Sequence, residues 1–368
     1  MFEFTISKQQ LLPPLLTVAG AVDKKQCVPI LANILVKLST STLSFTATDL
    51  DIEITGCVPC STSHGTGTIT VPSKKMIDII RTLDDDAIPT ISFHESLMTI
   101  KVGRSQFKLT TLAADDYPNT EDDVNEVELS VERHKLIHLF QSTHFAMSQQ
   151  DVRVYLNGLL LEIDSQGLTA VATDGHRMAI SKLPVTMNNQ HHRLLIPRKG
   201  IQEALRLLTG VEDQMVIVSA GKRQFKLKTQ DYSFSTKLLE ARFPPYNKAI
   251  PISQDKSVII LRDVLKRALS RITILANEKL RAILLQIVPG QLTLIANNQD
   301  QEEAVETLSA ETEGDELQIG VNATYLSDVL QHIQDGPLRL SFSSADSSIL
   351  LESLNDEHYS YIIMPMKL

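Results

Sequence analysis

The sequence has no tryptophan, only three cysteines and no long uncharged apolar run. A small, odd number of cysteines supplies no disulfide framework, which favours a reducing cytoplasm. The longest uncharged apolar stretch, Leu11 to Val22, has 12 residues and is interrupted by Pro13 and Pro14. It is too short to span a bilayer, so these absences exclude a stapled secreted scaffold and an integral membrane protein.

The same stretch has two interpretations. Lys8 precedes it and Ala19-Gly20-Ala21 closes it, a pattern typical of a signal peptide with its small-residue cleavage site. Glu3 lies in what would be the positive region, and the segment recurs in altered form later in the chain. These two features favour a folded helix.

The composition is that of a globular protein. The chain has 368 residues, of which 43% are hydrophobic and 21% charged, enough for about two to three domains with ordinary cores. The formal net charge of −9 argues against a protein that coats nucleic acid over its whole surface. A local basic face is still compatible with this charge.

Three stretches of the chain repeat one another, and a repeat predicts architecture more firmly than local propensity does. A first block recurs at offsets of 125 and then 124 residues, as Leu31–Val36, Leu156–Leu161 and Leu280–Leu285. The same offsets relate a second block, Leu43–Asp49, Leu168–Asp174 and Leu292–Asn298. A third block recurs in the same order, as Val71–Arg81, Ile196–Arg206 and Val321–Gln331. We therefore expect three tandem copies of one structural unit.

Each copy is expected to contain two helices and several strands. Helical apolar spacing opens each repeat and returns near its middle, for example at Met76, Ile79 and Ile80, and Pro72 and Pro197 suit a helix start. Alternating segments such as Leu43-x-Phe45-x-Ala47 have the period of a half-buried strand. The pattern predicts an α+β protein with antiparallel sheets. Apolar-proline pairs mark the repeat ends and predict domains at 1–126, 127–255 and 256–368.

Positive charge is concentrated in the expected helices. The six helical segments together carry a formal charge of +8, which leaves −17 for the rest of the chain, and only the segment 321–333 is negative. For any single residue, a solvated helix face is the plain explanation. If the repeated helices face one side, however, their lysines and arginines form a lining that attracts phosphates without reading bases.

With these features in view, the whole chain closely resembles the bacterial DNA polymerase III beta subunits, the family of sliding clamps. The residues that carry the resemblance are Val28–Leu31, Thr48–Leu50, Gln150–Arg153, Tyr155–Gly158, Ala172–Arg177, Arg242–Pro244, Asn277–Lys279 and Met364–Leu368. The resemblance implies three tandem DNA-clamp repeats, each with two helices packed on antiparallel sheets. It also implies a closed ring formed by a head-to-tail homodimer.

The resemblance further implies a non-catalytic processivity factor that encircles double-stranded DNA without sequence specificity and needs no cofactor or metal. The implied partners are the DNA polymerase III catalytic subunit, the clamp loader complex, and other polymerases and mismatch-repair proteins that carry clamp-binding motifs. No membrane partner is implied, and the implied location is cytoplasmic.

Three sets of site residues follow from the resemblance. For DNA contact they are Lys25, Lys74, Lys75, Gln150, Tyr155, Arg198 and Lys199. For the dimer interface they are Lys75, Arg104, Phe107, Leu109, Ile274, Leu275, Glu302, Glu303 and Glu306. For a pocket that accepts partner peptides they are Leu156, Thr173, Gly175, His176, Arg177, Met178, Pro244, Lys248, Asn322, Tyr325, Ser348, Ile362, Met364, Pro365 and Met366. The chain departs from the usual family residues at Gln106, Val154, Lys248 and Asp346.

Two motifs offer an enzymatic alternative, a hydrolase or a thiol enzyme. Thr173-Asp174-Gly175-His176-Arg177 places an acid, a base and a cation within five residues, groups that general acid-base catalysis uses. Because Asp174 corresponds to Asp49 and Asn298 in the other repeats, turn formation is the favoured interpretation.

The second motif is Cys57-Val58-Pro59-Cys60, which has the spacing of a redox or metal pair. The other repeats lack it, and a structural zinc site needs about four ligands. His191 and His192 lie in a polar turn and are expected at the surface.

Overall fold

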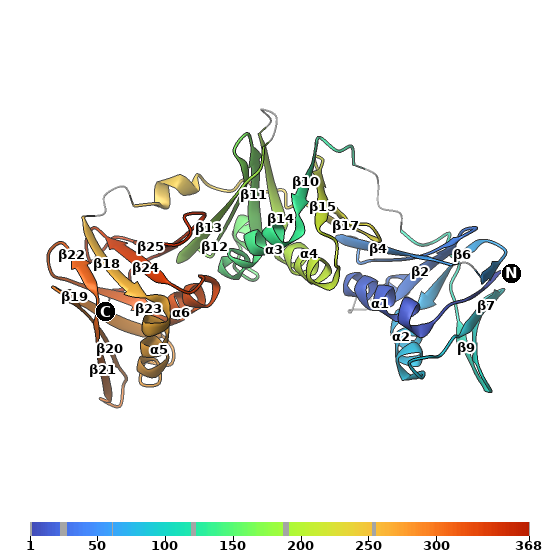
Figure 1. The fold of residues 1–368 in the computed structure, drawn as a ribbon, viewed down its shortest axis with the longest axis horizontal. Helices are drawn as coiled ribbons and strands as arrows, with labels where there is room; N and C mark the ends of the chain where they lie inside the picture. The colour runs from blue at the N-terminus through green and yellow to red at the C-terminus, as the bar shows by residue number, and fades with distance from the viewer. Residues whose placement is uncertain are drawn as a thin grey trace. The chain divides into compact units, whose positions relative to one another are not determined.

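The computed structural model describes residues 2–22, 28–60, 62–118, 123–186, 191–251 and 255–367 (Figure 1). It divides into two compact units. Unit 1 contains residues 1–134 and 202–238, and unit 2 contains residues 135–201 and 239–368. Each unit therefore includes one end of the chain and part of the second repeat.

The described residues form six α-helices, two in each sequence repeat as expected. They are α1 (Lys8–Val18), α2 (Ser73–Thr82), α3 (Arg133–Gln141), α4 (Arg198–Gly210), α5 (Arg262–Ile272) and α6 (Ala323–His332). The stretch with two interpretations folds as α1 and buries Leu11, Leu15 and Val18. Pro72 and Pro197 each end a strand and directly precede a helix, so their expected place at a helix start is confirmed.

Unit 1 contains two antiparallel sheets. The first has the order β5 (Thr62–His64), β1 (Phe2–Thr5), β7 (Thr90–His94), β8 (Leu97–Val102) and β9 (Ser105–Thr110). The second has the order β10 (Val127–Glu132), β15 (Met215–Ala220), β16 (Gln224–Lys228), β17 (Tyr232–Lys237), β4 (Ile52–Pro59), β3 (Thr42–Thr48), β2 (Asn33–Leu38) and β6 (Gly67–Pro72). Strands of the first two repeats join in this second sheet, where Phe234 of β17 pairs with Ile54 of β4.

Unit 2 repeats this plan with the second and third sequence repeats. Its larger sheet has the order β14 (His192–Pro197), β11 (Gly158–Asp164), β12 (Gly167–Thr173), β13 (Arg177–Pro184), β26 (Tyr359–Ile363), β25 (Ile349–Ser353), β24 (Pro337–Phe342), β18 (Lys256–Leu261) and β22 (Glu311–Glu313). Its smaller sheet has the order β21 (Glu303–Ser309), β20 (Gln291–Asn297), β19 (Ala282–Val288) and β23 (Leu317–Asn322). The repeats join where Ala179 of β13 pairs with Tyr361 of β26.

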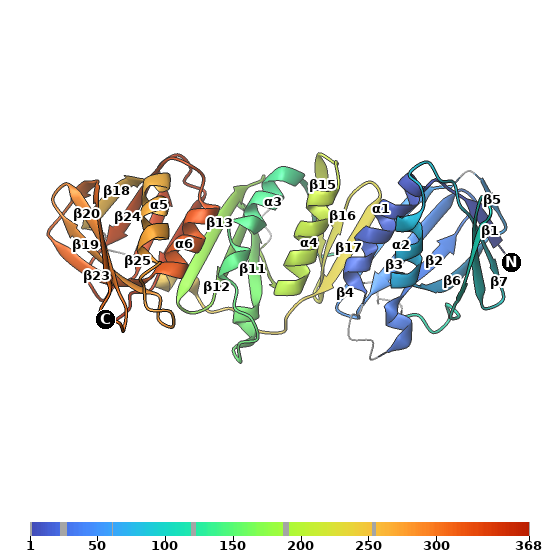
Figure 2. The ribbon, with the colours of Figure 1, turned by 90° about the horizontal axis from the view of Figure 1, so that it is seen from below.

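The predicted alternation of apolar residues produces the sheet cores. In β3, Leu43, Phe45 and Ala47 are fully buried, while the residues between them are partly exposed. Within unit 1, α1 contacts α2 and lies against β3 and β4, and within unit 2, α5 contacts α6 (Figures 1 and 2). None of the described helices is long and apolar enough to cross a membrane.

Candidate partner-peptide site and DNA-contact residues

The Asp174 motif forms a turn that recurs in all three repeats. The Asp174 Oδ1 atom accepts hydrogen bonds from the backbone amides of His176 and Arg177, each at 2.9 Å. Asp49 accepts two backbone bonds in the same way in the first repeat, and Asn298 does so in the third. The interpretation of Asp174 as a turn residue is therefore confirmed, since its carboxylate is engaged in holding the chain reversal.

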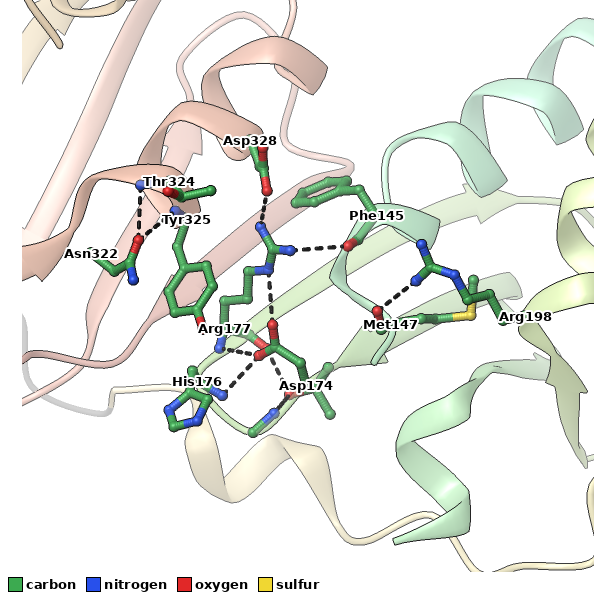
Figure 3. A network of polar contacts seen from close by, with 12 residues as sticks. Phe145, Met147, Asp174, His176, Arg177, Arg198, Asn322, Thr324, Tyr325 and Asp328 are labelled. Carbon is green, nitrogen blue, oxygen red and sulfur yellow. Dashed lines mark hydrogen bonds and ion pairs between the residues drawn. The ribbon is translucent and has the colours of Figure 1, made fainter. Parts of the chain in front are cut away.

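Arg177, the first residue of β13, lies at the centre of a polar network in unit 2 (Figure 3). Its guanidinium contacts the carboxylates of Asp174, at 3.1 Å, and of Asp328 on α6. It also donates to the Phe145 carbonyl oxygen at 3.2 Å and lies 4.8 Å from the centre of the Tyr325 ring. The Arg177 side chain is only 11% exposed, so two carboxylates, one carbonyl and an aromatic face compensate its charge where water does not.

This network fixes α6 next to the turn at 174–177. The His176 ring stacks on the Tyr325 ring at a centroid distance of 6.1 Å and an interplanar angle of 15° (Figure 3). Asn322 caps α6 by accepting from the amides of Thr324 and Tyr325. Burial raises the pKa of the Tyr325 phenol, and the nearby Asp174 carboxylate raises it further. The sequence-predicted residues His176, Arg177, Asn322 and Tyr325 therefore lie together.

The C-terminal segment joins the same cluster through its backbone. The Met364 amide donates to the His176 carbonyl oxygen, and the Met366 amide donates to the Gly320 carbonyl oxygen, both at 2.8 Å. In the pairing of β13 with β26, Met178 lies opposite Ile362. The last described residues thus extend the β13–β26 junction, which explains how residues so distant in sequence come to lie together.

The connecting segment 239–250 lies against the same sheet. Tyr246, on the short helix η5 (Tyr246–Ala249), donates to the Glu162 carboxylate at 2.7 Å, and Arg193 contacts the other oxygen of that carboxylate at 3.0 Å. Burial, reinforced by the Glu162 carboxylate, raises the pKa of the Tyr246 phenol. This contact positions Pro244 and Lys248 relative to the sheet.

The remaining predicted pocket residues lie on neighbouring elements. Leu156 is buried on η4 (Val154–Asn157), and the Thr173 hydroxyl donates to the Arg177 carbonyl oxygen at 2.6 Å. Gly175 adopts a φ of +89°, a left-handed conformation that favours glycine. Pro244 and Lys248 are exposed, whereas Pro365 and Ser348, which precedes β25, are half-buried.

Sequence reasoning missed Phe145 and Asp328, which hold the Arg177 guanidinium. A signal for Asp328 was present, because it is the residue that makes the expected helix at 321–333 negative while the other five are positive. No comparable signal marked Phe145, which contributes a backbone oxygen and an aromatic face.

The predicted DNA-contact residues differ in how exposed their side chains are. Lys74 and Lys75 are exposed in the first turn of α2, and Lys199 is exposed in the first turn of α4. Arg198 donates to the Met147 carbonyl oxygen at 2.6 Å and so also has a structural role (Figure 3). Tyr155 is half-buried, Gln150 is exposed, and Lys25 lies outside the described residues.

The predicted interface residues lie on or beside the end strands β9 and β21, in the first turn of α2 and just after α5. Phe107 and Leu109 are half-buried on β9, which is the last strand of its sheet. Glu303 and Glu306 lie on β21, also a last strand, and Glu302 directly precedes it. Lys75, Arg104, Glu302 and Glu303 are exposed, Leu275 is half-buried, and Ile274 is 77% exposed. Glu306 pairs with Arg271 of its own chain, and this contact lowers the pKa of the Glu306 carboxyl.

The cysteine motif lies on and just after β4. Burial is the main cause of a raised pKa for both the Cys57 and the Cys60 thiols, which leaves less thiolate for nucleophilic or redox chemistry. Among the described residues, no three His, Cys, Asp or Glu side chains gather in a way that could hold a metal ion.

Family comparison covers nearly the whole chain. Three family models match in order: the N-terminal domain of the DNA polymerase III beta subunit over residues 2–121, its central domain over 130–245 and its C-terminal domain over 247–367. The chain belongs to the DNA polymerase III beta subunit family. The family resemblance and the three-repeat clamp fold expected from the sequence are thereby confirmed.

Individual relatives agree with this assignment. The chain is 42% identical to the beta sliding clamp of Pseudomonas putida, covering 99% of this chain and 100% of the relative. It is 37% identical to the beta sliding clamp of Escherichia coli, with complete coverage of both chains. A crystal structure of the Pseudomonas aeruginosa sliding clamp bound to griselimycin superposes with a TM-score of 0.97 at 40% identity, again covering both chains completely. The family consists of non-catalytic processivity factors, so the expectation of a protein without enzymatic activity is confirmed.

Proposed function

We propose that this processivity factor closes into a ring as a head-to-tail homodimer, encircles duplex DNA and binds short partner peptides at the site around His176. The ring proposal rests on the repeated sheet plan. In each repeat one strand follows the turn formed by Asp49, Asp174 or Asn298, and in the first two repeats it pairs with the last strand of the next repeat. Thus β4 pairs with β17, and β13 pairs with β26. By the same rule, β21 of the third repeat is expected to pair with β9 of a second chain's first repeat.

The repeat correspondence also predicts the register of that pairing. Ile54 pairs with Phe234 at the first junction, and Ala179 pairs with Tyr361 at the second. Both Phe234 and Tyr361 correspond to Phe107, because β8 pairs Ile100 with Phe107 as β16 pairs Leu227 with Phe234. Ala304 occupies the matching place on β21, opposite Ala296 of β20. Phe107 is therefore expected opposite Ala304, and Gln106 opposite Val305.

A closed ring explains how an acidic chain holds DNA. Retention by topology requires only weak attraction, so exposed lysines such as Lys74, Lys75 and Lys199 suffice as phosphate contacts. A head-to-tail contact is heterologous and gives a ring when its rotation closes. We assign the three domains to 1–126, 127–255 and 256–368 and the protein to the cytoplasm.

The observation that carries the peptide proposal is the bonding of the C-terminal segment to His176 and Gly320. It brings Met364 and Met366 to the cluster of His176, Tyr325 and Met178. Small apolar walls with a few polar groups suit peptides anchored by leucine or phenylalanine. We propose the DNA polymerase III catalytic subunit, the clamp loader, and other polymerases and mismatch-repair proteins with clamp-binding motifs as partners.

A fluorescence-polarisation titration tests the peptide site. A labelled Gln-Leu-Ser-Leu-Phe peptide is titrated with the intact chain and with a chain that ends at Ile363. We expect binding to the intact chain and its loss in the shortened chain, because Met364 to Leu368 are then missing. Lys367→Ala serves as the control, since Lys367 is exposed and should leave binding unchanged. Equal binding by the intact and shortened chains would contradict the proposal.

A further inference from the structure

A separate cavity of about 480 Å³ lies in unit 2 beneath the connecting segment 240–243. Its walls are Leu160 of β11, Arg193 and Leu195 of β14, and the connecting residues themselves. We propose that this strap cavity binds an extension of the partner peptide that carries a carboxylate beside an apolar side chain. The inference rests on the proposed peptide-binding function and adds a specificity site to it.

The floor of the strap cavity packs against residues of the proposed partner-peptide site. Leu160, Leu195 and Phe243 are 2%, 5% and 4% exposed and pack in one hydrophobic cluster with Met178 and Ile362. Phe243 also directly precedes Pro244 in the chain. A peptide anchored at the Met178 and Ile362 side therefore needs only a short extension to reach the cavity.

Hydrogen bonds on both sides hold the connecting segment 240–243 in place. The cavity is therefore formed before any peptide binds. At one end the Leu239 amide donates to the Leu195 carbonyl oxygen at 2.8 Å. At the other end Tyr246 donates to Glu162 at 2.7 Å. A preformed cavity lowers the conformational entropy lost on binding, which favours affinity from a small number of contacts.

The charge at the cavity predicts an anionic group on the occupant. Two guanidinium groups, of Arg193 and Arg242, and one carboxylate, of Glu240, line it. Glu162 partly neutralises Arg193, whereas Arg242 is exposed at the rim. A carboxylate near Arg242 would form a charge-assisted hydrogen bond, while the apolar floor favours an aliphatic neighbour over a bare ion. An Asp-Leu dipeptide has both features.

Fluorescence polarisation with the full chain tests the strap cavity. The labelled core peptide Gln-Leu-Ser-Leu-Phe is compared with versions that add Asp-Leu or Ser-Ser at either end. We expect one Asp-Leu version to bind about fivefold more tightly than its Ser-Ser match, with the gain shrinking as salt rises. Arg242→Ala should reduce the gain to less than about twofold while leaving the affinity for the core peptide unchanged.

A second variant distinguishes the effect of the cavity's volume from the effect of its charge. Ala241→Leu adds volume to the cavity wall and keeps both arginines, so it should also remove the gain in affinity. Arg339→Ala, at an exposed arginine of β24 outside every proposed site, should not. A core peptide that fails to bind the intact chain would overturn both the proposed function and this inference. A core peptide that binds without any gain from either Asp-Leu extension, or a gain that survives in both Arg242→Ala and Ala241→Leu, would overturn the inference alone.

Discussion

The Arg177 guanidinium carbon lies 4.8 Å from the centre of the Tyr325 ring, although the two residues belong to different sequence repeats. The contact joins the first residue of β13 to the first turn of α6. It is reinforced by the ion pair between Arg177 and Asp328. The geometry of the proposed peptide site should therefore depend on a charge network formed in part by its own residues.

Replacing Asp328 by asparagine should loosen this network while keeping the shape of the side chain. We expect the free energy of unfolding to fall by about 1.5–3 kcal/mol, because a largely buried guanidinium loses a charged partner. Affinity for the Gln-Leu-Ser-Leu-Phe peptide should fall about tenfold, as Tyr325 loses its fixed position. Urea unfolding and fluorescence polarisation measure the two effects.

Asp335→Asn is the matched control for that variant. Asp335 is 70% exposed and lies 3.7 Å from Arg262, a surface pair that contributes about 0–1 kcal/mol. We expect no change in peptide affinity. An Asp328→Asn protein that binds as tightly as the parent would show that the network does not position the site.

Paired cysteines test the predicted seam register. Residues directly opposite on antiparallel strands have Cα atoms about 4.5–5.5 Å apart, within disulfide reach. A chain with Gln106→Cys and Val305→Cys should therefore form a covalent dimer on mild oxidation, visible on a non-reducing gel. The pair Gln106→Cys and Glu303→Cys, shifted by two residues on the same face, should cross-link poorly. Preferential cross-linking of the shifted pair would refute the register.

Two substitutions distinguish phosphate contact from structural support. Lys74→Ala should lower the salt dependence of binding to a short duplex by about 0.9 in the log–log slope, because one counterion-releasing contact is lost. Its melting temperature should not change, since Lys74 is exposed. Arg198→Ala should lower both the salt dependence of DNA binding and the melting temperature, because the Met147 carbonyl oxygen also loses its donor. If the two variants had identical effects in both measurements, the structural role assigned to Arg198 and not to Lys74 would be contradicted.

The loop before η4 should show a distinctive acid titration. Arg153, through a side-chain hydrogen bond, lowers the pKa of Asp151 from 3.8 to about 2. A depressed folded-state pKa means that this interaction is fully present above the ordinary value and is lost as pH falls towards 2. Carbon NMR of labelled aspartate should show Asp151 still ionised at pH 3.8 in the parent and more protonated there in Arg153→Ala, which keeps only the backbone hydrogen bond from residue 153. Arg104→Ala should titrate like the parent, and an unshifted Asp151 in the parent would refute the assignment.

The repeat pattern could predict local structure that depends on neighbouring residues. Apolar spacing around Met76 located α2, and the correspondence of Asp174 with Asp49 and Asn298 identified a shared turn before any hydrogen bond was visible. In each case the interacting groups lie within a few residues. Such features depend on local backbone geometry, which sequence patterns encode directly.

Contacts between distant segments could not be predicted in the same way. Asp328 lies 151 residues from Arg177, and their pairing depends on how the β13–β26 junction places α6. Glu306, which is expected at the dimer interface, pairs within its own chain with Arg271, 35 residues away. The strap cavity likewise depends on a segment between two repeats, where the repeat pattern gives no guidance.

The pairing of each repeat with the next has a consequence for the isolated chain. It leaves β9 at one end and β21 at the other as last strands in their sheets, and each has unpaired backbone groups that invite another strand. A heterologous contact of this kind has two outcomes, a finite ring or an endless filament, and only the angle between successive subunits decides between them. Ring closure would therefore also protect the protein against polymerisation through β9 and β21, because it pairs these two end strands with each other.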